Sequence, residues 1–359
     1  MRALRIYAGP RARALLEREG LQAPRVKLIP GAAGGPKGLI LGPLDRFIFG
    51  DWLAQTDHEV QLVGASIGAW RMATACLKAP LAALDRLERD YIHQDYVLPP
   101  GQKRPSADQV SAVFGRNLKD FYGNRLGEIL HHPRYRLHIL ASRGRGLLRR
   151  EHPLLTPLGY LGAFVGNAVQ RRLMGQLLER SVFSAGQGEV PFDAADYPTQ
   201  ALALTADNFH AALQASCSIP FVLRSVSGIS GAPPGAYWDG GLTDYHLHLD
   251  YRPLCANDGL VLYPHFQRSV VPGWLDKSLK WRHGATPFLD NVVLLAPDPQ
   301  WVATLPNGKL PDRSDFTRYT GDLAGRVKAW TGAVSQARQL ADEFAAWLDK
   351  PDMRMVQPL

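Results

Sequence analysis

Short apolar runs alternate along the chain with longer segments in which apolar residues recur every three or four positions. Runs of the first kind are typical of buried strands, and the second pattern predicts helices with one apolar face. The predicted strands are residues 4–8, 26–31, 60–66, 137–142, 181–186, 200–206, 259–265 and 291–297. Because strands alternate with helices, we expect an α/β fold around a mainly parallel central sheet.

Helical patterns follow several of these strands. One predicted helix begins at Gly68 and ends before Pro80, because proline cannot continue a helix. Residues 81–94 and 323–349 also carry apolar side chains at helical spacing. We expect 323–349, within a C-terminal helical extension at 315–359, to pack on its own domain. An intermolecular interface is the alternative.

Residues 95–180 interrupt the alternation, and we expect them to form a helical insertion or lid in a single domain of residues 1–359. The proline-rich stretch at 96–109 comes first, and an apolar segment at 154–180 follows. That segment places seven apolar side chains at helical spacing, namely Leu158, Leu161, Phe164, Val165, Val169, Leu173 and Leu177. Such a stripe favours packing in the core. A lid or an interfacial helix would give the same pattern.

Composition and charge narrow the class of protein. The chain has 359 residues, of which 46% are hydrophobic, so it can bury a large core. Its 41 basic and 33 acidic residues leave a formal charge of +8, which attracts nucleic acid, anionic lipid or acidic substrates. No strand pair interleaves aromatic and basic residues, so we do not expect nucleic-acid binding. The basic stretch at 142–151 favours a solvated face, with contact to lipid head groups as the alternative.

Cysteines and apolar stretches bear on the location of the protein. Cys76, Cys217 and Cys255 show no CxxC or Cys/His ligand spacing, so neither a structural disulfide nor a zinc site is expected. No uninterrupted apolar run reaches about 18 residues, and Gly9-Pro10 breaks the N-terminal run before a signal-peptide core could form. We therefore expect a cytoplasmic protein, for which the basic charge permits peripheral contact with an anionic membrane.

The stretch GASIGAW at 64–70 directly follows the apolar run VQLV. A GxSxG pattern suits a sharp strand-to-helix turn, because small flanking residues let the turn close around the serine. Ser66 would then lie at a helix N-terminus, where N–H groups stabilise developing negative charge. In a chain with 34 glycines the pattern also arises by chance, so an ordinary tight turn remains the alternative.

A second glycine-rich turn, PGAAGGPKGLILG at 30–42, follows another apolar run. Such turns expose several backbone N–H groups that suit a phosphate or an oxyanion. A P-loop would need Gly-Lys followed by Ser or Thr, whereas Lys37 lies between Pro36 and Gly38. The GxGxxG spacing is absent as well. An oxyanion hole and a structural loop both remain open.

A serine nucleophile also needs a base. The candidate histidines have no distinctive setting, and we expect each to be a surface or packed residue: His246, His248, His265 and His283. Asp239 follows two aromatic residues and precedes Gly240 and Gly241. Asp-Gly-Gly is usually a turn. A carboxylate held there could instead accept the Ser66 proton, if burial raises its basicity.

Taken in this order, the elements resemble the patatin-like phospholipase family. The matches are Gly34-Gly35-Pro36-Lys37-Gly38 to its glycine-rich loop, Gly64-Ala65-Ser66-Ile67-Gly68 to its GxSxG turn, Asp239-Gly240-Gly241 to its late Asp-Gly-Gly, and Ala215-Ser216-Cys217-Ser218-Ile219-Pro220 to the segment upstream. Ala32 and Ala33 replace the Asp and first Gly of the family loop. The resemblance spans roughly residues 24–265, and the family has no counterpart for the insertion.

The resemblance implies a patatin-like three-layer α/β/α fold and a Ser-Asp dyad. In it Ser66 is the nucleophile, Asp239 the general base, and the Gly34 and Gly35 amides form the oxyanion hole. Lys37 would hold the loop or face a phosphate. No metal or cofactor is required. The implied function is a serine acyl hydrolase of lipid esters, namely phospholipid or lysophospholipid. A soluble carboxylesterase or thioesterase with the same dyad, and a non-catalytic lipid-binding module, are the alternatives.

Overall fold

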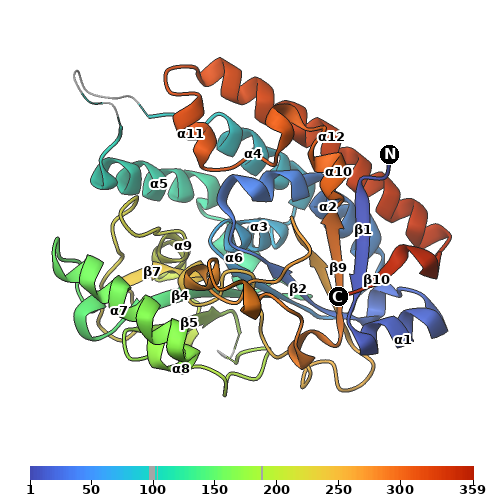
Figure 1. The fold of residues 1–359 in the computed structure, drawn as a ribbon, viewed down its shortest axis with the longest axis horizontal. Helices are drawn as coiled ribbons and strands as arrows, with labels where there is room; N and C mark the ends of the chain where they lie inside the picture. The colour runs from blue at the N-terminus through green and yellow to red at the C-terminus, as the bar shows by residue number, and fades with distance from the viewer. Residues whose placement is uncertain (97–101, 103, 187–188) are drawn as a thin grey trace.

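A ten-stranded mixed sheet forms the centre of the computed structural model, which describes residues 1–96, 102, 104–186 and 189–359 (Figure 1). The strands are β1 (Leu4–Ala8), β2 (Val26–Gly31), β3 (Val60–Ala65), β4 (Tyr135–Gly144), β5 (Leu178–Ser184), β6 (Thr199–Ala203), β7 (Tyr237–Asp239), β8 (Leu260–Pro264), β9 (Val292–Pro297) and β10 (Val356–Pro358). Their order is β10-β1-β9-β8-β2-β3-β4-β5-β6, and β7 pairs with β4.

The five strands in the middle of the sheet run parallel to one another, and the pairs β10-β1 and β5-β6 at its two edges run in the opposite direction. Neighbouring strands run parallel from β9 through β8, β2 and β3 to β4. Strand β1 is antiparallel to β9, and β5 is antiparallel to β4. The central strands are buried along nearly their whole length, as parallel strands covered on both faces are. The predicted α/β fold with a mainly parallel sheet is therefore confirmed.

All eight predicted strands are present: β1 and β2 have the predicted bounds, and the ends of the others differ by a few residues. Strands β7 and β10 were not predicted. Each has three residues, too few to show an alternating pattern.

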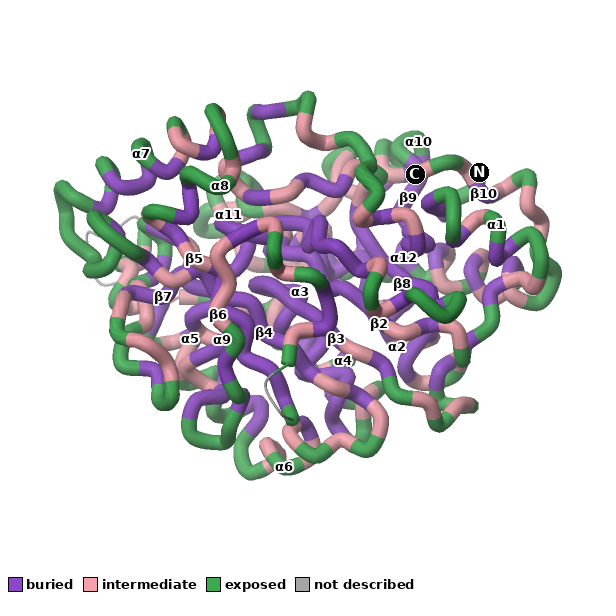
Figure 2. The backbone as a smooth tube through the Cα atoms, turned by 90° about the horizontal axis from the view of Figure 1, so that it is seen from below, coloured by how far each residue is buried: buried purple, intermediate pink, exposed green. Residues whose placement is uncertain are grey.

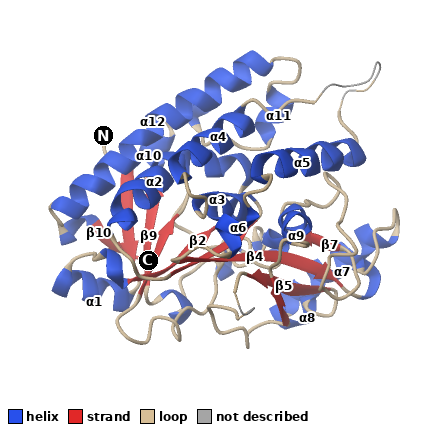
Figure 3. Cartoon of the chain, turned by 180° about the vertical axis from the view of Figure 1, so that it is seen from behind, coloured by secondary structure: helices blue, strands red, loops and turns tan. Residues whose placement is uncertain are grey.

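The helices of the described residues are α1 (Pro10–Glu19), α2 (Gly42–Arg46), α3 (Ile67–Ala75), α4 (Pro80–Ile92), α5 (Ala107–Tyr122), α6 (Leu126–Leu130), α7 (Leu155–Val169), α8 (Arg171–Met174), α9 (Phe209–Ser216), α10 (Pro299–Val302), α11 (Ser314–Arg318) and α12 (Leu323–Asp349). Helices α4, α5 and α12 gather on one side of the sheet, and α7 and α8 lie toward the other (Figure 3).

Helix α12 has the predicted bounds. The Asp322 side chain accepts a hydrogen bond from the Gly325 amide and caps its N-terminus. Phe344 makes edge-on ring contacts with Phe47 and Trp52, at centroid distances of 5.9 and 5.8 Å. The expectation that this helix packs on its own domain is confirmed. The C-terminal segment is not wholly helical, because β10 follows α12 and pairs with β1.

The interval 95–180 is not a wholly helical insertion either. Strand β4 lies within it, and β4 pairs with β3 on one side and β5 on the other. The last residues of the interval already belong to β5. The proline-rich stretch falls partly on 97–101 and 103, which lie outside the described residues.

The prediction that the apolar stripe at 154–180, which spans α7 and α8, belongs to the core is wrong. Five stripe residues have exposed fractions of 45% to 73%, and Figure 2 shows α7 at the edge of the molecule: they are Leu158, Leu161, Val165, Val169 and Leu173. The buried face of α7 carries Gly159, Tyr160, Ala163 and Asn167 instead. Small residues let this face approach closely, since a Cβ on Gly159 would lie 2.6 Å from a methyl carbon of Leu148.

No helix among the described residues has the length and apolar character needed to cross a membrane.

Candidate active site

Ser66 lies in a sharp turn between β3 and α3. Its backbone has a φ of 56° and a ψ of −129°, a conformation that costs free energy in a residue with a side chain and occurs often at functional sites. Neighbouring glycines make the turn possible. A Cβ on Gly68 would lie 1.8 Å from the Gly31 carbonyl oxygen, and one on Gly64 would lie 2.4 Å from the Ala69 Cα. The GxSxG pattern is therefore required locally, because a side chain at either glycine would collide with neighbouring backbone atoms.

Strand pairing brings Asp239 to Ser66. Strand β3 ends where Ala65 pairs with Leu140 of β4, and Asp239 of β7 pairs with the next β4 residue, Ala141. Because β5 occupies the other edge of β4 at Ala141, β7 must lie on the β3 side. It therefore continues the sheet just beyond the end of β3, where Ser66 begins the turn.

The two side chains form a direct hydrogen bond. The Ser66 hydroxyl donates to Asp239 Oδ2 at 2.8 Å, and the residues are only 4% and 6% exposed. The other carboxylate oxygen, Oδ1, accepts from the Gly241 amide at 2.7 Å. This geometry meets the hydrogen-bond distance expected of a nucleophile and its base.

Opposing influences set the basicity of Asp239. Desolvation by burial is the largest and raises its pKa above the ordinary 3.8. The positive charge of Arg313 and the hydrogen bonds from Ser66 and Gly241 oppose this rise but do not cancel it. The carboxylate is thus a stronger base than an exposed aspartate.

Hydrogen bonds from nearby serines hold the backbone of Ser66 and of Asp239 in place. Ser216 Oγ accepts from the Ser66 amide at 2.9 Å and donates to the Leu140 carbonyl at 2.6 Å. The Asp239 amide donates to the Ser218 carbonyl, and Ser142 Oγ donates to the Asp239 carbonyl, both at 2.9 Å. The Ala215–Pro220 motif therefore has a positioning role at both members of the pair.

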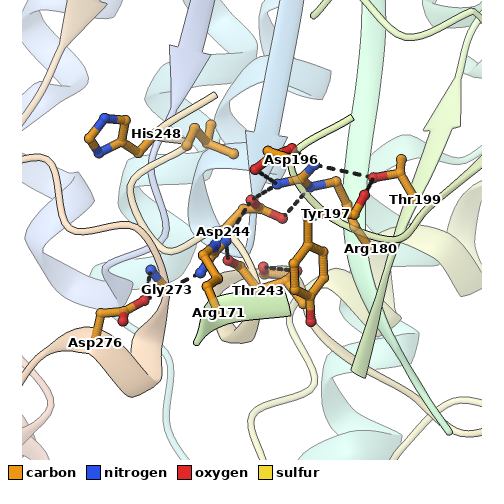
Figure 4. A network of polar contacts seen from close by, with 12 residues as sticks. Arg171, Arg180, Asp196, Tyr197, Thr199, Thr243, Asp244, His248, Gly273 and Asp276 are labelled. Atoms are coloured by element: carbon orange, nitrogen blue, oxygen red, sulfur yellow. Dashed lines mark hydrogen bonds and ion pairs between the residues drawn. The ribbon is translucent and has the colours of Figure 1, made fainter. Parts of the chain in front are cut away.

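A buried ion pair anchors the turn that follows Asp239 (Figure 4). Arg180 of β5 is fully buried, and it donates to both carboxylate oxygens of Asp244 at 2.8 and 2.6 Å. It also donates to Asp196 at 3.0 Å. Burial alone would raise the pKa of Asp244, but Arg180 holds it below the ordinary value. Asp244 in turn donates its amide to the Gly240 carbonyl, which ties the network to the Asp-Gly-Gly turn.

The glycine-rich loop lies against the same site. Ala33 lines a pocket with Asp239 and Gly241, and its amide donates to the Tyr245 carbonyl at 2.9 Å. Within the described part of the chain, the amides of Gly34 and Gly35 have no hydrogen-bond acceptor. The loop thus carries two unpaired backbone donors directly after Ala33, which lines the pocket.

The glycines of this loop leave no room for side chains. A Cβ on Gly34 would lie 2.5 Å from the Phe266 ring. Gly35 has a φ of 57°, in the left-handed region that favours glycine. Ala32 and Ala33, which precede these glycines, are both buried.

The pocket beside Ser66 and Asp239 opens to solvent, and its empty volume of about 260 Å³ includes part of that solvent space. Its lining combines backbone of the turn with apolar side chains and one cation, namely Ala33, Ile219, Pro220, Asp239, Gly241, Leu242, Tyr245, Trp274 and Arg313.

The candidate histidines serve other contacts. Ring nitrogens of His246, His248 and His265 contact backbone carbonyl oxygens, and His283 Nε2 lies 2.8 Å from the Asp276 carbonyl. Burial lowers the pKa of His248 to about 4 and that of His265 to about 3, which keeps both neutral. No histidine among the described residues hydrogen-bonds to Ser66, whose hydroxyl donates to the Asp239 carboxylate instead.

Two cations near the site were not predicted from the sequence. Arg313 lines the pocket, and Lys277 Nζ lies 4.1 Å from the ring centroid of Tyr245, another lining residue. Both come from irregular segments without a motif. The predicted Lys37 is half-buried, with its Nζ 5.3 Å from the ring centroid of Phe266, and desolvation lowers its pKa.

Comparison with known proteins adds no assignment, since no family model and no curated protein matches the chain. The described residues contain no group of three or more His, Cys, Asp or Glu placed to hold a metal ion. What the site can do is therefore inferred from its geometry and from the family resemblance of its motifs.

Proposed function

We propose that the chain is a patatin-like serine acyl hydrolase with a three-layer α/β/α fold, in which Ser66 is the nucleophile and Asp239 the general base. One observation carries the proposal, namely the 2.8 Å hydrogen bond from the Ser66 hydroxyl to the buried Asp239 carboxylate. The strained backbone of Ser66 and its place before α3 support it, because a nucleophile in such a turn faces the substrate.

Acylation follows from the placement of these groups. Asp239 takes the hydroxyl proton as the Ser66 oxygen bonds to the ester carbonyl carbon, and the carbonyl electrons move onto oxygen. The Gly34 and Gly35 amides stabilise that oxyanion, and one such donor is typically worth about 3–4 kcal/mol in the transition state. When the oxyanion collapses, the carbon–oxygen bond to the alcohol breaks and protonated Asp239 gives the alcohol its proton.

Deacylation repeats the sequence with water. Asp239 takes a proton from water, the water oxygen attacks the acyl carbonyl, and the same amides stabilise the second oxyanion. Collapse releases the carboxylic acid, and Asp239 returns its proton to the Ser66 oxygen. Atoms and protons balance without a metal or a redox group, so activity is expected to persist in the presence of a chelator.

The surface beside the pocket supports a lipid ester as the substrate. We call the following exposed side chains the α7 patch: Leu147, Leu154, Leu155, Leu158, Leu161, Val165, Val169, Leu173, Phe221 and Val222. Tyr160 on the buried face of α7 connects them to the site, with ring contacts to Phe221 and to Trp238, which precedes Asp239. Ile219 and Pro220, which line the pocket, lead directly into the patch.

The same surface supports peripheral contact with an anionic membrane. Arg149 and Arg150 are exposed just before α7 begins. A helix with an apolar face and neighbouring basic residues lies in the lipid interface, where apolar burial and attraction to anionic head groups add together. The proposed protein is thus a cytoplasmic enzyme that takes its substrate from a membrane surface.

Ester hydrolysis by four variants tests the proposal. We expect p-nitrophenyl ester hydrolysis by the wild type, with a preference for long acyl chains, and its loss in Ser66→Ala and Asp239→Asn. Matched controls are Ser181→Ala, whose buried hydroxyl has no partner in the described structure, and the exposed Asp207→Asn. Both should retain wild-type rates.

Other outcomes select the alternatives. A preference for short soluble esters or thioesters, with the same losses, would indicate a soluble esterase. Hydrolysis that survives both active-site changes would contradict the dyad. Vesicle binding without hydrolysis of any ester would leave a lipid-binding module.

A further inference from the structure

A buried ion pair joins the helix that follows Ser66 to the helix that follows the glycine-rich loop. Arg71 lies on α3, five residues after Ser66, and Asp45 lies on α2, which begins directly after the turn Gly35–Leu41. The Arg71 Nε and Nη2 donate to the two carboxylate oxygens of Asp45, each at 2.6 Å. Both side chains are at most 4% exposed. The pair is therefore a two-point contact, closed to solvent, between the segments that carry the proposed nucleophile and the proposed amide donors.

The two residues depend on each other. In the part of the chain that the structure describes, their side chains hydrogen-bond only to one another, and the third guanidinium nitrogen, Arg71 Nη1, is buried without a partner. The apolar residues that border the same small pocket as the pair are Leu39, Ile67, Leu84 and Leu87. These side chains can pack against the pair, but they cannot replace either of its charges.

Stability alone does not account for such a pair. Its burial removes the hydration of two charges, and apolar residues of similar volume often stabilise a fold equally well or better. A guanidinium and a carboxylate that are bonded at two points have a defined distance and direction. Apolar contacts tolerate small shifts, since a core loses rigidity before it loses stability. The pair therefore suits a place where α2 and α3 must hold one exact relative position.

The position of α2 determines that of the glycine-rich loop. The turn Gly35–Leu41 runs directly into α2. The turn also lies against α3, since a Cβ on Gly38 would be 3.2 Å from the side chain of Ile67, the residue after Ser66. A shift of α2 along α3 would therefore move the amides at the start of the turn relative to the serine.

We propose that Arg71 and Asp45 are positioning residues, whose ion pair sets the distance from the Ser66 oxygen to the Gly34 and Gly35 amides. This inference rests on the proposed acyl hydrolase function. Donors stabilise an oxyanion only at hydrogen-bond distance, and a misplacement of about 1 Å can lower a rate about 100-fold. Neither residue borders the pocket that contains Asp239. Loss of the pair should therefore lower kcat and leave KM nearly unchanged.

The kinetic test replaces both residues by leucine. Asp45→Leu/Arg71→Leu leaves no buried charge alone, so we expect it to fold, whereas Arg71→Leu leaves Asp45 unpaired and should be destabilised. Thermal unfolding verifies both expectations. For the double variant we expect kcat with a p-nitrophenyl ester to fall about 10-fold or more at an unchanged KM. The matched control is Arg143→Leu/Glu179→Leu, which removes a 2.6 Å ion pair between β4 and β5 and should keep the wild-type kcat.

Two readouts separate positioning from a loss of folded protein. The burst of p-nitrophenol from a long-chain alkyl p-nitrophenyl phosphonate counts the active sites, so kcat is expressed per counted site. A long-chain trifluoromethyl ketone forms a hemiketal oxyanion on the serine, and its affinity should fall by the same factor as kcat/KM. An alcohol of equal chain length forms no oxyanion and should bind the double variant as it binds the wild type.

Hydrogen exchange tests the inference without turnover. Amide exchange in the turn Gly35–Leu41 should be faster in Asp45→Leu/Arg71→Leu than in the wild type. The control variant Arg143→Leu/Glu179→Leu should exchange in this turn as the wild type does.

Each outcome decides between the two claims. If the double leucine variant keeps the wild-type kcat per counted site, or loses affinity for the ketone and the alcohol equally, the pair is only structural and the hydrolase stands. If the wild type hydrolyses no ester, the proposed function fails and hydrogen exchange decides the rest. Faster exchange in the turn would then support positioning of the loop by the pair, and unchanged exchange would refute it.

Discussion

At Asp239, burial and positive charge act in opposite directions on one carboxylate. Burial raises its pKa, while Arg313 and the hydrogen bonds from Ser66 and Gly241 limit the rise. A base that is too weak would not take the serine proton, and one with too high a pKa would be protonated and inactive. In the proposed mechanism, this balance lets Asp239 take the role of base that a histidine has in many serine hydrolases.

For the proposed hydrolase, this balance predicts how activity depends on pH. The dyad needs ionised Asp239, so activity should be lost as pH falls through its pKa, and the acid limb should lie above the ordinary 3.8. Arg313 stabilises the ionised form, so Arg313→Gln should move the limb to higher pH. The measurement is kcat/KM against pH with a neutral ester. A limb that stays in place, or that moves to lower pH, would refute the electrostatic role of Arg313.

The sequence predicted Ser66 and Asp239 because each lies in a short motif whose glycines are required locally. Gly68 meets the Gly31 backbone, and Gly241 donates its amide to the Asp239 carboxylate. Arg313 and Lys277 could not be predicted in this way. Their nearness to the pocket depends on how irregular segments cross the finished fold, and no local pattern encodes it.

At the scale of elements, helical periodicity showed that α7 has an apolar face but not what covers it. The helix docks through Gly159, Tyr160 and Ala163, and its leucines and valines face outward. Strand β7 was not predicted, because its three residues are too few to show an alternating pattern. This strand nevertheless brings Asp239 to Ser66. Both ends of helix α12 were predicted correctly. Its apolar pattern is long, and the residue that caps its N-terminus directly precedes it in the sequence.

The exposed face of α7 predicts binding to anionic vesicles. Leu158→Gln/Leu161→Gln should weaken partitioning to phosphatidylglycerol vesicles about 10-fold or more, since burying one leucine contributes about 1.5–3 kcal/mol. Thermal stability should change little, because both side chains are exposed. The control is Leu81→Gln, an exposed leucine on α4, which should bind as the wild type does.

Sedimentation of vesicles with the bound protein measures the effect. Equal partitioning of the double variant would argue against the patch as a membrane contact. A wild-type dimer that the double variant converts to a monomer would assign the same face to self-association instead.

The ion pair between Arg180 of β5 and Asp244 predicts a large cost when one partner is removed. Arg180→Met leaves Asp244 buried without its main partner, which typically costs about 3–5 kcal/mol of unfolding free energy. Arg180→Met/Asp244→Leu should be less destabilised than Arg180→Met, because no buried charge is left alone. Denaturant unfolding measures both. Equal stability of Arg180→Met and the wild type would show that the pair does not stabilise the turn.

At the scale of the whole molecule, the sheet order gathers residues that are far apart in sequence. Strands β2 and β3 run parallel and side by side, so the glycine-rich loop and Ser66, which follow their ends, meet at one edge of the sheet. The antiparallel β7 brings Asp239 to that edge from the opposite direction. The placement of the proposed nucleophile, base and amide donors therefore depends on one mixed sheet.

The most direct test of the Ser-Asp account is covalent capture of the nucleophile. A long-chain alkyl p-nitrophenyl phosphonate reacts with an activated serine, releases p-nitrophenol and leaves a stable adduct that mass spectrometry locates. The account predicts a single adduct on Ser66 in the wild type and in Ser181→Ala. Ser66→Ala should form no adduct, and Asp239→Asn should form it far more slowly. Ester hydrolysis by a protein whose Ser66 remains unmodified, or an adduct on another residue that abolishes activity, would contradict it.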